Sequence, residues 1–558
     1  MEFSAIDTVW VLLGTVLVFF MQAGFAMVES GFTRAKNAGN IIMKNLMDFS
    51  LGSLCYWIIG FGLMYGVSMG GFIGTMDAFI LNPADYDSNV PGYVTLMFQT
   101  VFCATSATIV SGAMAERTKF SSYCMYSVVL SALVYPISGH WIWGGGWLSE
   151  MGFHDFAGST AVHMVGGVAA LIGAKMLGAR IGKYDEDGTP KAILGHNLTI
   201  GALGVFILWF CWFGFNGGSS LGIEGQEELV GLVYVTTNLA TCAAAATTMA
   251  ITWVKYGKPD VSMSLNGALG GLVAITAGCD AMDPFGAVIT GMIAAFIIVF
   301  GIEFVDRVLK IDDPVGAVGV HGMCGAFGTI AVGIFSTSEG LVYGNGASLL
   351  MVQVIGVLAV AAWVTVTMGV VFSVIKATVG LRVSAHEEIN GLDVEEHGLI
   401  TSYADFMPVT EGPTSAPVTA AATETVAVST TIPAGESSGI TKVTIITRQS
   451  KFESLKTAME TIGITGMTAT QVMGCGTQKG STEYYRGVQV AINLLPKIQV
   501  EIVVANVPVE LVVETAKKVL HTGSYGDGKI FVYPVADVVK VRTGEQGTVA
   551  LLDTPAES

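Results

Sequence analysis

Long apolar stretches separated by short polar connections dominate residues 1–383 of the sequence. Stretches long enough to form a membrane-spanning helix fall at about 7–28, 46–70, 92–115, 120–138, 159–179, 197–215, 231–253, 261–279, 285–304, 314–336 and 349–376. A helix that crosses a membrane needs about 20 predominantly apolar residues. The pattern therefore predicts an α-helical polytopic membrane domain with eleven transmembrane helices over residues 1–383.

The positions of the basic residues predict how these helices are oriented. Every Lys and Arg of residues 1–403 follows an odd-numbered stretch, and the alternate connections contain none. Because basic residues are concentrated on the cytoplasmic side, we expect the N-terminus outside and the C-terminal part in the cytoplasm, with the chain in the cytoplasmic membrane. Charged residues make up only 13% of the chain, and its mean hydropathy is +0.62, as expected of a protein in lipid. The net charge of -17 argues against a nucleic-acid partner.

Two of the predicted helices begin with related sequences. DFAGSTAVHMVGG starts at Asp155 and DPVGAVGVHGMCG starts at Asp313, and both place Gly at +3, Val at +7, His at +8 and Gly at +12. Five spans separate the copies, so the second copy runs the opposite way through the bilayer. This is the signature of an inverted repeat, here five helices plus five, which builds a substrate site near the middle of the membrane.

The repeat places His163 and His321 at the same depth. Eight helical residues rise about 12 Å, and half of the hydrocarbon thickness is about 15 Å. Imidazoles at this depth are costly unless they act on a substrate or satisfy each other. We favour a polar pair that lines a permeation path and shares a proton; the alternative is a pair of structural histidines joined by a hydrogen bond.

Aromatic side chains and a hydroxyl lie at the expected outer helix ends. Trp143 stands in HWIWGGGW, Phe98 and Phe102 in FQTVF, and Phe215 and Ser219 in WFGFNGGS. Aromatic faces attract cations, so these residues are candidates for an outer cation site, although interfacial aromatics also serve as membrane anchors. Asp155 either caps a helix N-terminus, as does Asp313, or contacts the substrate.

Residues 1–403 resemble the Amt branch of the Amt/Mep/Rh ammonium transporter family. The matching blocks are GFAMVESGFTRAKN, SGAMAER, WIWGGGWL, DFAGSTAVH, FGFNGGS, GVHGMCG and GLDVEEHG. The resemblance implies a homotrimer in which each subunit has a narrow apolar pore. It assigns His163 and His321 to the pore; Trp143, Phe102, Ser219 and Asp155 to ammonium binding; and Phe102 with Phe215 to a gate. It further implies that NH4+ is bound outside and deprotonated, and that NH3 then passes the histidines, with the proton moving separately or along them.

The C-terminal part has the composition of a short connection followed by a soluble domain. We expect a cytoplasmic region at 384–406 and a flexible linker at 407–439, which is rich in Thr, Ala, Pro and Ser and would span about 30 Å as a random coil. Alternating patterns over 440–548 predict the order strand–helix–strand–strand–helix–strand, which is a ferredoxin-like α+β (βαββαβ) domain. The last strand-like segment covers 528–544.

Residues 440–548 resemble the PII signal-transduction family through GITGMT, QKG, EYYRG, LPKIQVEIVV, TGSYGDGKIFV and VRTGE. The resemblance implies binding of ADP or ATP, with magnesium alongside ATP and 2-oxoglutarate as a further candidate ligand. It assigns adenine-nucleotide positions to Thr468, Gly474, Gly476, Gly526, Asp527, Gly528, Lys529 and Arg542. It assigns ATP–magnesium and 2-oxoglutarate positions to Gln478 and Lys497.

Two positions of the tail depart from this family. Val490 stands where some members carry a tyrosine that is uridylylated, so we expect that control to be absent. Lys540 stands where the first of two phosphate-binding arginines is usual, and it keeps the charge but loses the planar fork. The family also implies docking of the tail on the cytoplasmic face of the pore, where Arg486 is a candidate plug.

Three functions of the membrane part are left open by the sequence. The favoured one is ammonium uptake regulated by the tail. The others are an ammonium receptor with little flux that signals through the tail, and an electroneutral gas channel of the Rh type. Neither half contains a nucleophile–base pair or a metal-binding cluster, so we expect no enzyme, with slow ATP hydrolysis by the tail left open.

Overall fold

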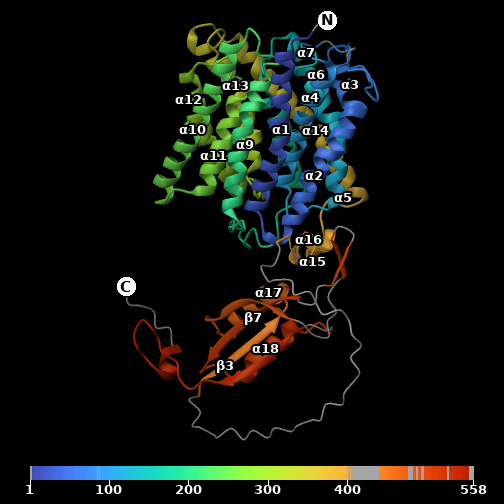
Figure 1. The fold of residues 1–558 in the computed structure, drawn as a ribbon. Coiled ribbons are helices and arrows are strands. Elements are labelled where there is room, and N and C mark those ends of the chain that lie inside the picture. The colour runs from blue at the N-terminus through green and yellow to red at the C-terminus, as the bar shows by residue number, and fades with distance from the viewer. Residues whose placement is uncertain are drawn as a thin grey trace. The chain divides into compact units, whose positions relative to one another are not determined.

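The computed structural model of the chain describes residues 3–83, 86, 88–399, 402–403, 439–474, 482–485, 488–491, 495–523 and 527–551. The chain divides into two compact units, Met1–Ala404 and Asp405–Ser558. The first unit is a bundle of long helices and the second is a small sheet with two helices (Figure 1).

Long helices form the first unit, and several of them contain a wider π-helical turn. In chain order they are α1 (Ala5–Phe32), α2 (Ala38–Cys55) with η2 (Tyr56–Gly60) and α3 (Phe61–Tyr65), α4 (Gly92–Ala113), α5 (Phe120–Val129) with η4 (Leu130–Val134) and α6 (Tyr135–Ile142), η5 (Ser159–Met164) with α8 (Val165–Leu177), α9 (Leu198–Gly218), α10 (Glu227–Tyr256), α11 (Val261–Ile275), α12 (Pro284–Glu303) with η6 (Phe304–Val308), η7 (Val318–Met323) with α13 (Cys324–Phe335), and α14 (Ser348–Thr378). The shorter elements are η1 (Ala35–Asn37), α7 (Trp147–Glu150), η8 (Leu341–Tyr343), α15 (Ala385–Asn390), α16 (Leu392–His397) and a hairpin of β1 (Ser68–Met69) and β2 (Ile73–Gly74).

Ten helices in the described part of the chain are long and apolar enough to cross a membrane, rather than the eleven expected. The difference lies at the predicted eighth span, 261–279, where the apolar helix α11 ends at Ile275. Its next carbonyls are used elsewhere, because Ala157 N–H donates to the Thr276 carbonyl (3.2 Å) and Phe156 N–H to that of Ala277 (3.0 Å). The helix therefore stops where it anchors the segment that leads into η5. The five-plus-five repeat stays a prediction.

Small residues let helices from distant parts of the sequence pack closely. α1 and α9 lie side by side (Figure 1). A Cβ placed on Gly31 of α1 would lie 2.4 Å from the backbone nitrogen of Gly201 in α9, so only glycine fits there. Close backbone approach of this kind is the usual basis of helix packing in membranes, where helices gain no hydrophobic energy by leaving lipid.

One end of the bundle, which we call the basic end, is held together by a buried ion network. Arg180 donates through Nε to Asp312 (2.8 Å) and through Nη1 to Glu116 (3.0 Å), and Arg34 also pairs with Glu116. Burial alone would raise the pKa of Asp312, but Arg180 and Arg117 hold that pKa well below its ordinary value. These pairs join the connections after α1, α4, α8 and α12.

The segment after α14 packs on the same end of the bundle. Asp393 of α16 accepts hydrogen bonds from the backbone N–H groups of Gly39 (3.0 Å) and Asn40 (2.7 Å) at the start of α2. Arg382 pairs with the buried Glu388, whose other oxygen accepts the N–H of Ile181 (2.7 Å). The sequence GLDVEEHG thus fastens the C-terminal segment to the helix bundle.

The second unit is a four-stranded antiparallel sheet covered on one face by two helices. Its elements are β3 (Thr441–Thr447), η9 (Gln449–Lys451), α17 (Phe452–Thr461), β4 (Thr468–Gly474), β7 (Leu495–Val504), α18 (Val509–Leu520), β8 (Lys529–Pro534) and η10 (Gly547–Leu551). The strand order β4-β7-β3-β8 and the chain order βαββαβ confirm the predicted ferredoxin-like arrangement.

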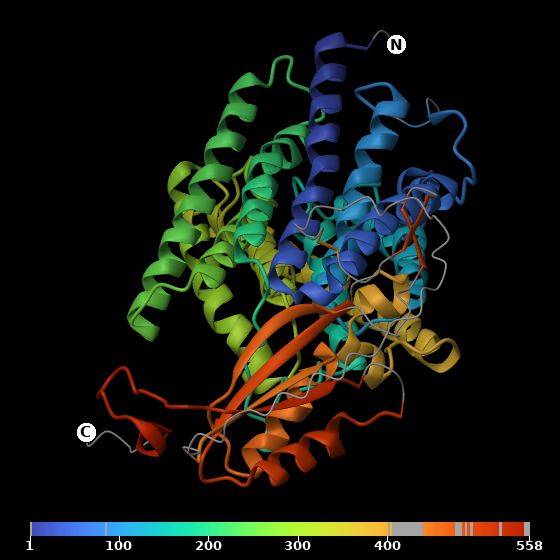
Figure 2. The same ribbon diagram turned by 60° about the horizontal axis from the view of Figure 1, so that its bottom comes forward.

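Apolar side chains from both helices pack against the sheet to form a separate core. Leu455 and Met459 of α17 and Val512 of α18 meet Val443 and Ile445 of β3. Figure 2 shows the strands as one layer with the helices on one side of it. Because this core contains only residues of the second unit, the unit has its own source of hydrophobic stability.

Two features of the second unit differ from the sequence-based expectation. The last strand ends at Pro534, well before residue 544, where Pro534 pairs with Thr441, the first residue of β3. Beyond it the chain folds back on itself, with an isolated bridge between Val539 and Gln546. In addition, β5 (Thr482–Tyr485) and β6 (Val488–Ala491) pair as a separate hairpin that the pattern did not predict.

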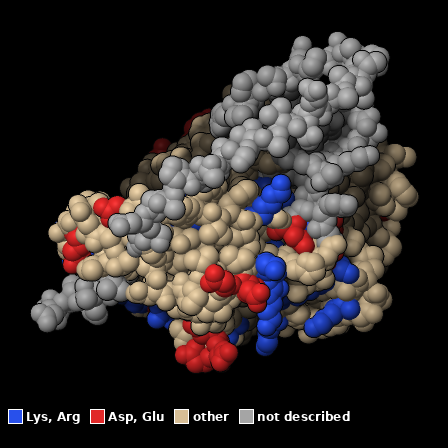
Figure 3. All heavy atoms as spheres, turned by 90° about the horizontal axis from the view of Figure 1, so that it is seen from below, with Lys and Arg blue, Asp and Glu red and all other residues tan. Residues whose placement is uncertain are grey.

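Basic and acidic side chains are interspersed on the face of the molecule shown in Figure 3. Among the described residues visible in this view, the acidic side chains do not form a single patch.

We expect the Asp312→Asn substitution to destabilise the first unit by about 3 kcal/mol or more, because it leaves the buried Arg180 without its bidentate partner. The measurement is the melting temperature of the purified protein in detergent. The matched control is Asp185→Asn, which removes an exposed partner of Lys191 and should leave the melting temperature nearly unchanged. Equal shifts for the two variants would contradict the role assigned to the network.

Candidate functional site

A broad cavity opens at the end of the bundle opposite to the basic end. It has a volume of about 560 Å³, and the predicted residues Trp143, Phe102 and Ser219 line it. The aromatic residues Phe61, Tyr65, Tyr86, Phe98 and Phe156 also line it. Such a surface offers several ring faces to a small cation.

Hydrogen bonds hold two of these residues in place. Trp143 donates from Nε1 to the backbone carbonyl of Asp155 (2.7 Å), which fixes the indole at the floor of the cavity. The Ser219 hydroxyl donates to the Phe215 carbonyl one turn earlier (2.8 Å). Because its proton is used in this way, the Ser219 oxygen can only accept from a molecule in the cavity.

Two stacked phenylalanines close the floor of the cavity. The rings of Phe102 and Phe215 lie 4.2 Å apart with an interplanar angle of 25°, and both side chains are buried. Trp143 meets Phe102 edge-on at 6.2 Å. The structure therefore brings the predicted gate together directly below the predicted binding residues.

The two predicted histidines lie immediately beyond the gate and contact each other. His163 stacks against Phe215 at 5.3 Å. Its Nδ1 lies 3.3 Å from Nδ1 of His321, and the rings are stacked at 5.2 Å. Both imidazoles are buried. In a contact between two neutral imidazoles, one Nδ1 carries the proton and the other accepts it, so the pair shares a single proton at this contact.

Each histidine is carried by a π-helical turn that begins after an aspartate. The Asp155 carboxylate accepts hydrogen bonds of 2.8–2.9 Å from the backbone N–H groups of residues 158–161, at the start of η5. Asp313 accepts those of Gly316 (3.0 Å) and Val318 (2.8 Å), before η7. The Asp155 carboxylate thus braces the backbone, and it is not among the groups that line the cavity. The repeated sequence pattern corresponds to a repeated local structure.

A glycine contact brings the two histidine-bearing segments together. A Cβ on Gly167, one turn after His163, would lie 2.1 Å from the backbone nitrogen of Gly322, which follows His321. Any larger residue at Gly167 would push the segments apart. The imidazole contact therefore depends on this close approach.

Sequence reasoning missed the residues that flank the imidazoles. Trp212 stacks on His163 at 4.9 Å and donates from Nε1 to the Thr276 hydroxyl (2.8 Å). Phe25 lies 6.0 Å from the ring of His321. The spacing of Trp212 to Phe215 puts both on one helical face, which was the available signal.

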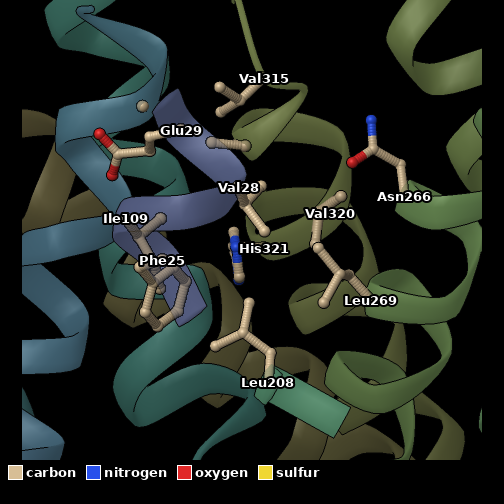
Figure 4. Close-up of a pocket in the computed structure, with 12 residues that line it drawn as sticks. Phe25, Val28, Glu29, Ile109, Leu208, Asn266, Leu269, Val315, Val320 and His321 are labelled. Carbon is tan, nitrogen blue, oxygen red and sulfur yellow. The ribbon is translucent and has the colours of Figure 1, made fainter. Parts of the chain in front are cut away.

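A small cavity lies on the far side of His321 from the gate. Apolar side chains of Phe25, Val28, Leu208, Leu269 and Val320 surround the imidazole there (Figure 4). From Trp143 to this cavity, the rings of Phe102, Phe215, His163 and His321 follow one another in contact.

In the second unit, the structure gathers some of the predicted nucleotide residues. Asp527, Gly528 and Lys529 line a groove of about 820 Å³ together with Lys517, Lys518 and His521 of the α18 end. Gly528 has φ +121, and a Cβ there would lie 2.1 Å from the Ile446 carbonyl, so the turn requires glycine. Three basic side chains beside a backbone turn suit an anionic ligand.

Electrostatic contacts extend this group toward β4. The Thr522 hydroxyl and backbone N–H hold the pKa of Asp527 below its ordinary value. Partial burial and the neighbouring Arg448 lower the pKa of Lys497. A Cβ on Gly474, at the end of β4, would be in ordinary contact with Lys497 (3.4 Å). Arg448, which pairs with Asp527 at 3.8 Å, was not predicted from the sequence.

The other predicted nucleotide residues are not brought together. Thr468 begins β4, and Lys540 lies on a turn where it pairs with Glu545 (4.0 Å). Arg542 lies on the same turn and is exposed. Gly476, Gln478 with its expected magnesium, Gly526 and Arg486 lie outside the described residues.

Comparison with known proteins assigns each unit separately. Residues 9–402 match the Ammonium Transporter Family, and residues 440–545 match Nitrogen regulatory protein P-II. The chain is 48% identical over 424 residues to ammonium transporter Amt2 of Archaeoglobus fulgidus, which covers 72% of this chain and 89% of that protein. It is 38% identical over 430 residues to ammonium transporter 1 member 3 of Solanum lycopersicum, which covers 71% and 92%.

Solved structures have the same helical fold. The structure named "Sensor Amt Protein" has a TM-score of 0.67 and 39% identity, and the match covers 70% of this chain and 98% of that chain. The crystal structure of Candida albicans Mep2 has a TM-score of 0.61 and 27% identity, covering 69% and 88%.

We expect the Phe215→Ala substitution to open the stacked gate, because Phe102 then loses its partner across the floor of the cavity. Water permeability of reconstituted vesicles, followed by stopped-flow light scattering, should rise severalfold. Phe210→Ala on the exposed side of α9 is the matched control and should leave permeability unchanged. A wild-type value for Phe215→Ala would show that the ring does not close the passage.

Proposed function

Because the chain belongs to the Ammonium Transporter Family and carries a P-II domain, as the resemblances indicated, we propose that it takes up ammonium into the cell under control of that domain. The observation that carries the transport proposal is the contact between His163 and His321 at the end of an aromatic cavity. The basic end of the bundle, by the distribution of Lys and Arg, faces the cytoplasm.

The outer cavity performs the first step of the proposed mechanism. Ammonium loses part of its hydration as Trp143 and Phe102 offer their ring faces, and it donates a hydrogen bond to the Ser219 oxygen. Potassium could approach the same rings but has no proton to donate. The cavity therefore already binds ammonium in preference to potassium.

The gate and the imidazoles perform the second step. A charged cation cannot cross the apolar route beyond Phe215 without losing hydration energy of many kcal/mol. Ammonium avoids this cost by giving a proton to the protein, and neutral ammonia then passes the gate. The proton enters the shared contact of the two imidazoles, which can accept it on one side and release it on the other. A cation with no dissociable proton stops at the gate.

The second candidate function is an ammonium sensor with little flux. It is favoured by the likeness to the structure named "Sensor Amt Protein", together with the fused regulatory domain. The stacked gate and the imidazole contact support a conducting pore instead. Ammonium flux through the reconstituted protein distinguishes a transporter from a sensor. A dependence of that flux on membrane voltage distinguishes a transporter from an electroneutral gas channel.

The P-II domain supplies the proposed control. Its groove of Lys517, Lys518 and Lys529 would bind the phosphates of ADP or ATP, with 2-oxoglutarate as a further ligand. We propose a homotrimer, since three-fold symmetry in both parts lets each tail act on a pore mouth. Covalent linkage raises the effective concentration of the tail at that surface.

We expect the His163→Ala substitution to lower the ammonium-induced current of reconstituted protein at least tenfold, because it removes the first proton acceptor below the gate. The current is measured on a solid-supported membrane after a rapid ammonium pulse. His386→Ala, at an exposed histidine of α15, should carry the wild-type current. Retention of the current by His163→Ala would refute the role of the imidazole pair.

For the tail, we expect isothermal titration of the full-length protein to show binding of ADP or ATP. Lys529→Ala should weaken that binding about tenfold, since one charge-assisted contact contributes about 1.5 kcal/mol. Lys456→Ala, an exposed lysine of α17, serves as the control and should bind as the wild type does. No heat with ADP, ATP or 2-oxoglutarate would remove the sensing proposal.

A further inference from the structure

The small cavity beyond His321 contains a carboxyl group that the transport steps above do not use. Its volume is about 20 Å³, and its polar lining residues are His321, Glu29 and Asn266. A cavity needs roughly 10–15 Å³ measured in this way to hold one water molecule. One water or one ammonia molecule therefore fits in the cavity that His321, Glu29 and Asn266 help to line.

Glu29 is buried in the wall of this cavity on α1. Glu29 is only 3% exposed. Its Oε2 accepts a hydrogen bond from the Ser111 hydroxyl on α4 (2.9 Å). Lys44 and Asp48 of α2 act on it electrostatically. A buried ionisable residue inside a membrane bundle is costly and usually lies on a path for ions or protons.

Asn266 provides a second, independent indication that a small polar molecule occupies this cavity. The residue is 7% exposed, and its Oδ1 has no hydrogen-bond partner among the described residues. A buried acceptor without a donor is energetically unfavourable. A water or ammonia molecule in the cavity would donate to it. Figure 4 shows Asn266 and Glu29 on opposite sides of His321, on α11 and α1 respectively.

We propose that Glu29 is the proton-exchange group on the cytoplasmic side of the imidazole pair, an inference that rests on the proposed ammonium transport. The N–H bond of a protonated His321 breaks, its electron pair stays on nitrogen, and the proton goes to a water molecule in the cavity. That water gives a proton to the Glu29 carboxylate, forming an O–H bond. The Glu29 O–H bond then breaks, and its proton joins ammonia that leaves the pore.

This assignment explains how the proton and ammonia recombine to ammonium on the cytoplasmic side of the imidazole pair. The imidazoles alone can hold a proton, but on this side they face a cavity lined by the apolar side chains of Val28, Leu208 and Leu269. Glu29 lies one turn of α1 beyond Phe25, which contacts the His321 ring. It therefore offers the next proton acceptor toward the basic end of the bundle.

The test compares Glu29→Gln and Glu29→Asp with the wild type in reconstituted full-length protein. Glutamine keeps the size of the side chain and can still accept from Ser111, but it cannot exchange a proton. Aspartate keeps the acid but shortens its reach. Glu150→Gln, at an exposed glutamate of α7, is the matched control. The readouts are the ammonium-induced current in H2O and D2O and the half-saturating ammonium concentration.

We expect Glu29→Gln to lower the current at least tenfold and Glu29→Asp about threefold, with an increased solvent isotope effect for Glu29→Asp and unchanged half-saturation for both. The control should match the wild type. Wild-type current and isotope effect in either variant would overturn the proposal, and Glu29→Asp alone decides the matter if Glu29→Gln does not assemble. An absence of current in the wild type would instead contradict the underlying transport proposal.

Discussion

The contact between two imidazoles in an apolar surrounding is the interaction on which the rest of the membrane unit depends. Two nitrogens 3.3 Å apart can share one proton, whereas the same groups separated by lipid or a wider channel would each be an unsatisfied polar group. Asp155 and Asp313 hold the turns that present them, and the approach of Gly167 to Gly322 sets their separation. The stacked rings of Phe102 and Phe215 lie between this contact and the aromatic cavity.

The predicted histidines were found from sequence because a repeated motif fixes their depth. Asp, Gly and His recur at the same offsets in both copies. The helical rise over eight residues then predicts that both rings lie near the middle of the membrane. Trp212 and Asn266 could not be placed in the same way, since their roles arise from contacts between helices that are far apart in the chain. Glu29 stands within a recognised block, yet only the fold shows that it borders the cavity beyond His321.

Element boundaries were predicted less well where tertiary contacts replace helical or sheet hydrogen bonds. α11 ends early because the carbonyls of Thr276 and Ala277 bind the segment before η5. β8 ends at Pro534, opposite Thr441, where its partner strand β3 begins. In the second unit, the alternation of apolar residues predicted the fold. Which of the predicted nucleotide residues lie together depends on loops, and no local sequence pattern determines the positions of those loops.

The account is tested most directly by the cation selectivity of charge movement through the reconstituted wild-type protein. Equal pulses of ammonium and potassium should be applied to the same vesicles on a solid-supported membrane. If the shared proton of His163 and His321 is the means of passage, ammonium gives a saturable current and potassium gives none. Equal currents for the two cations, or no current with ammonium, would contradict it.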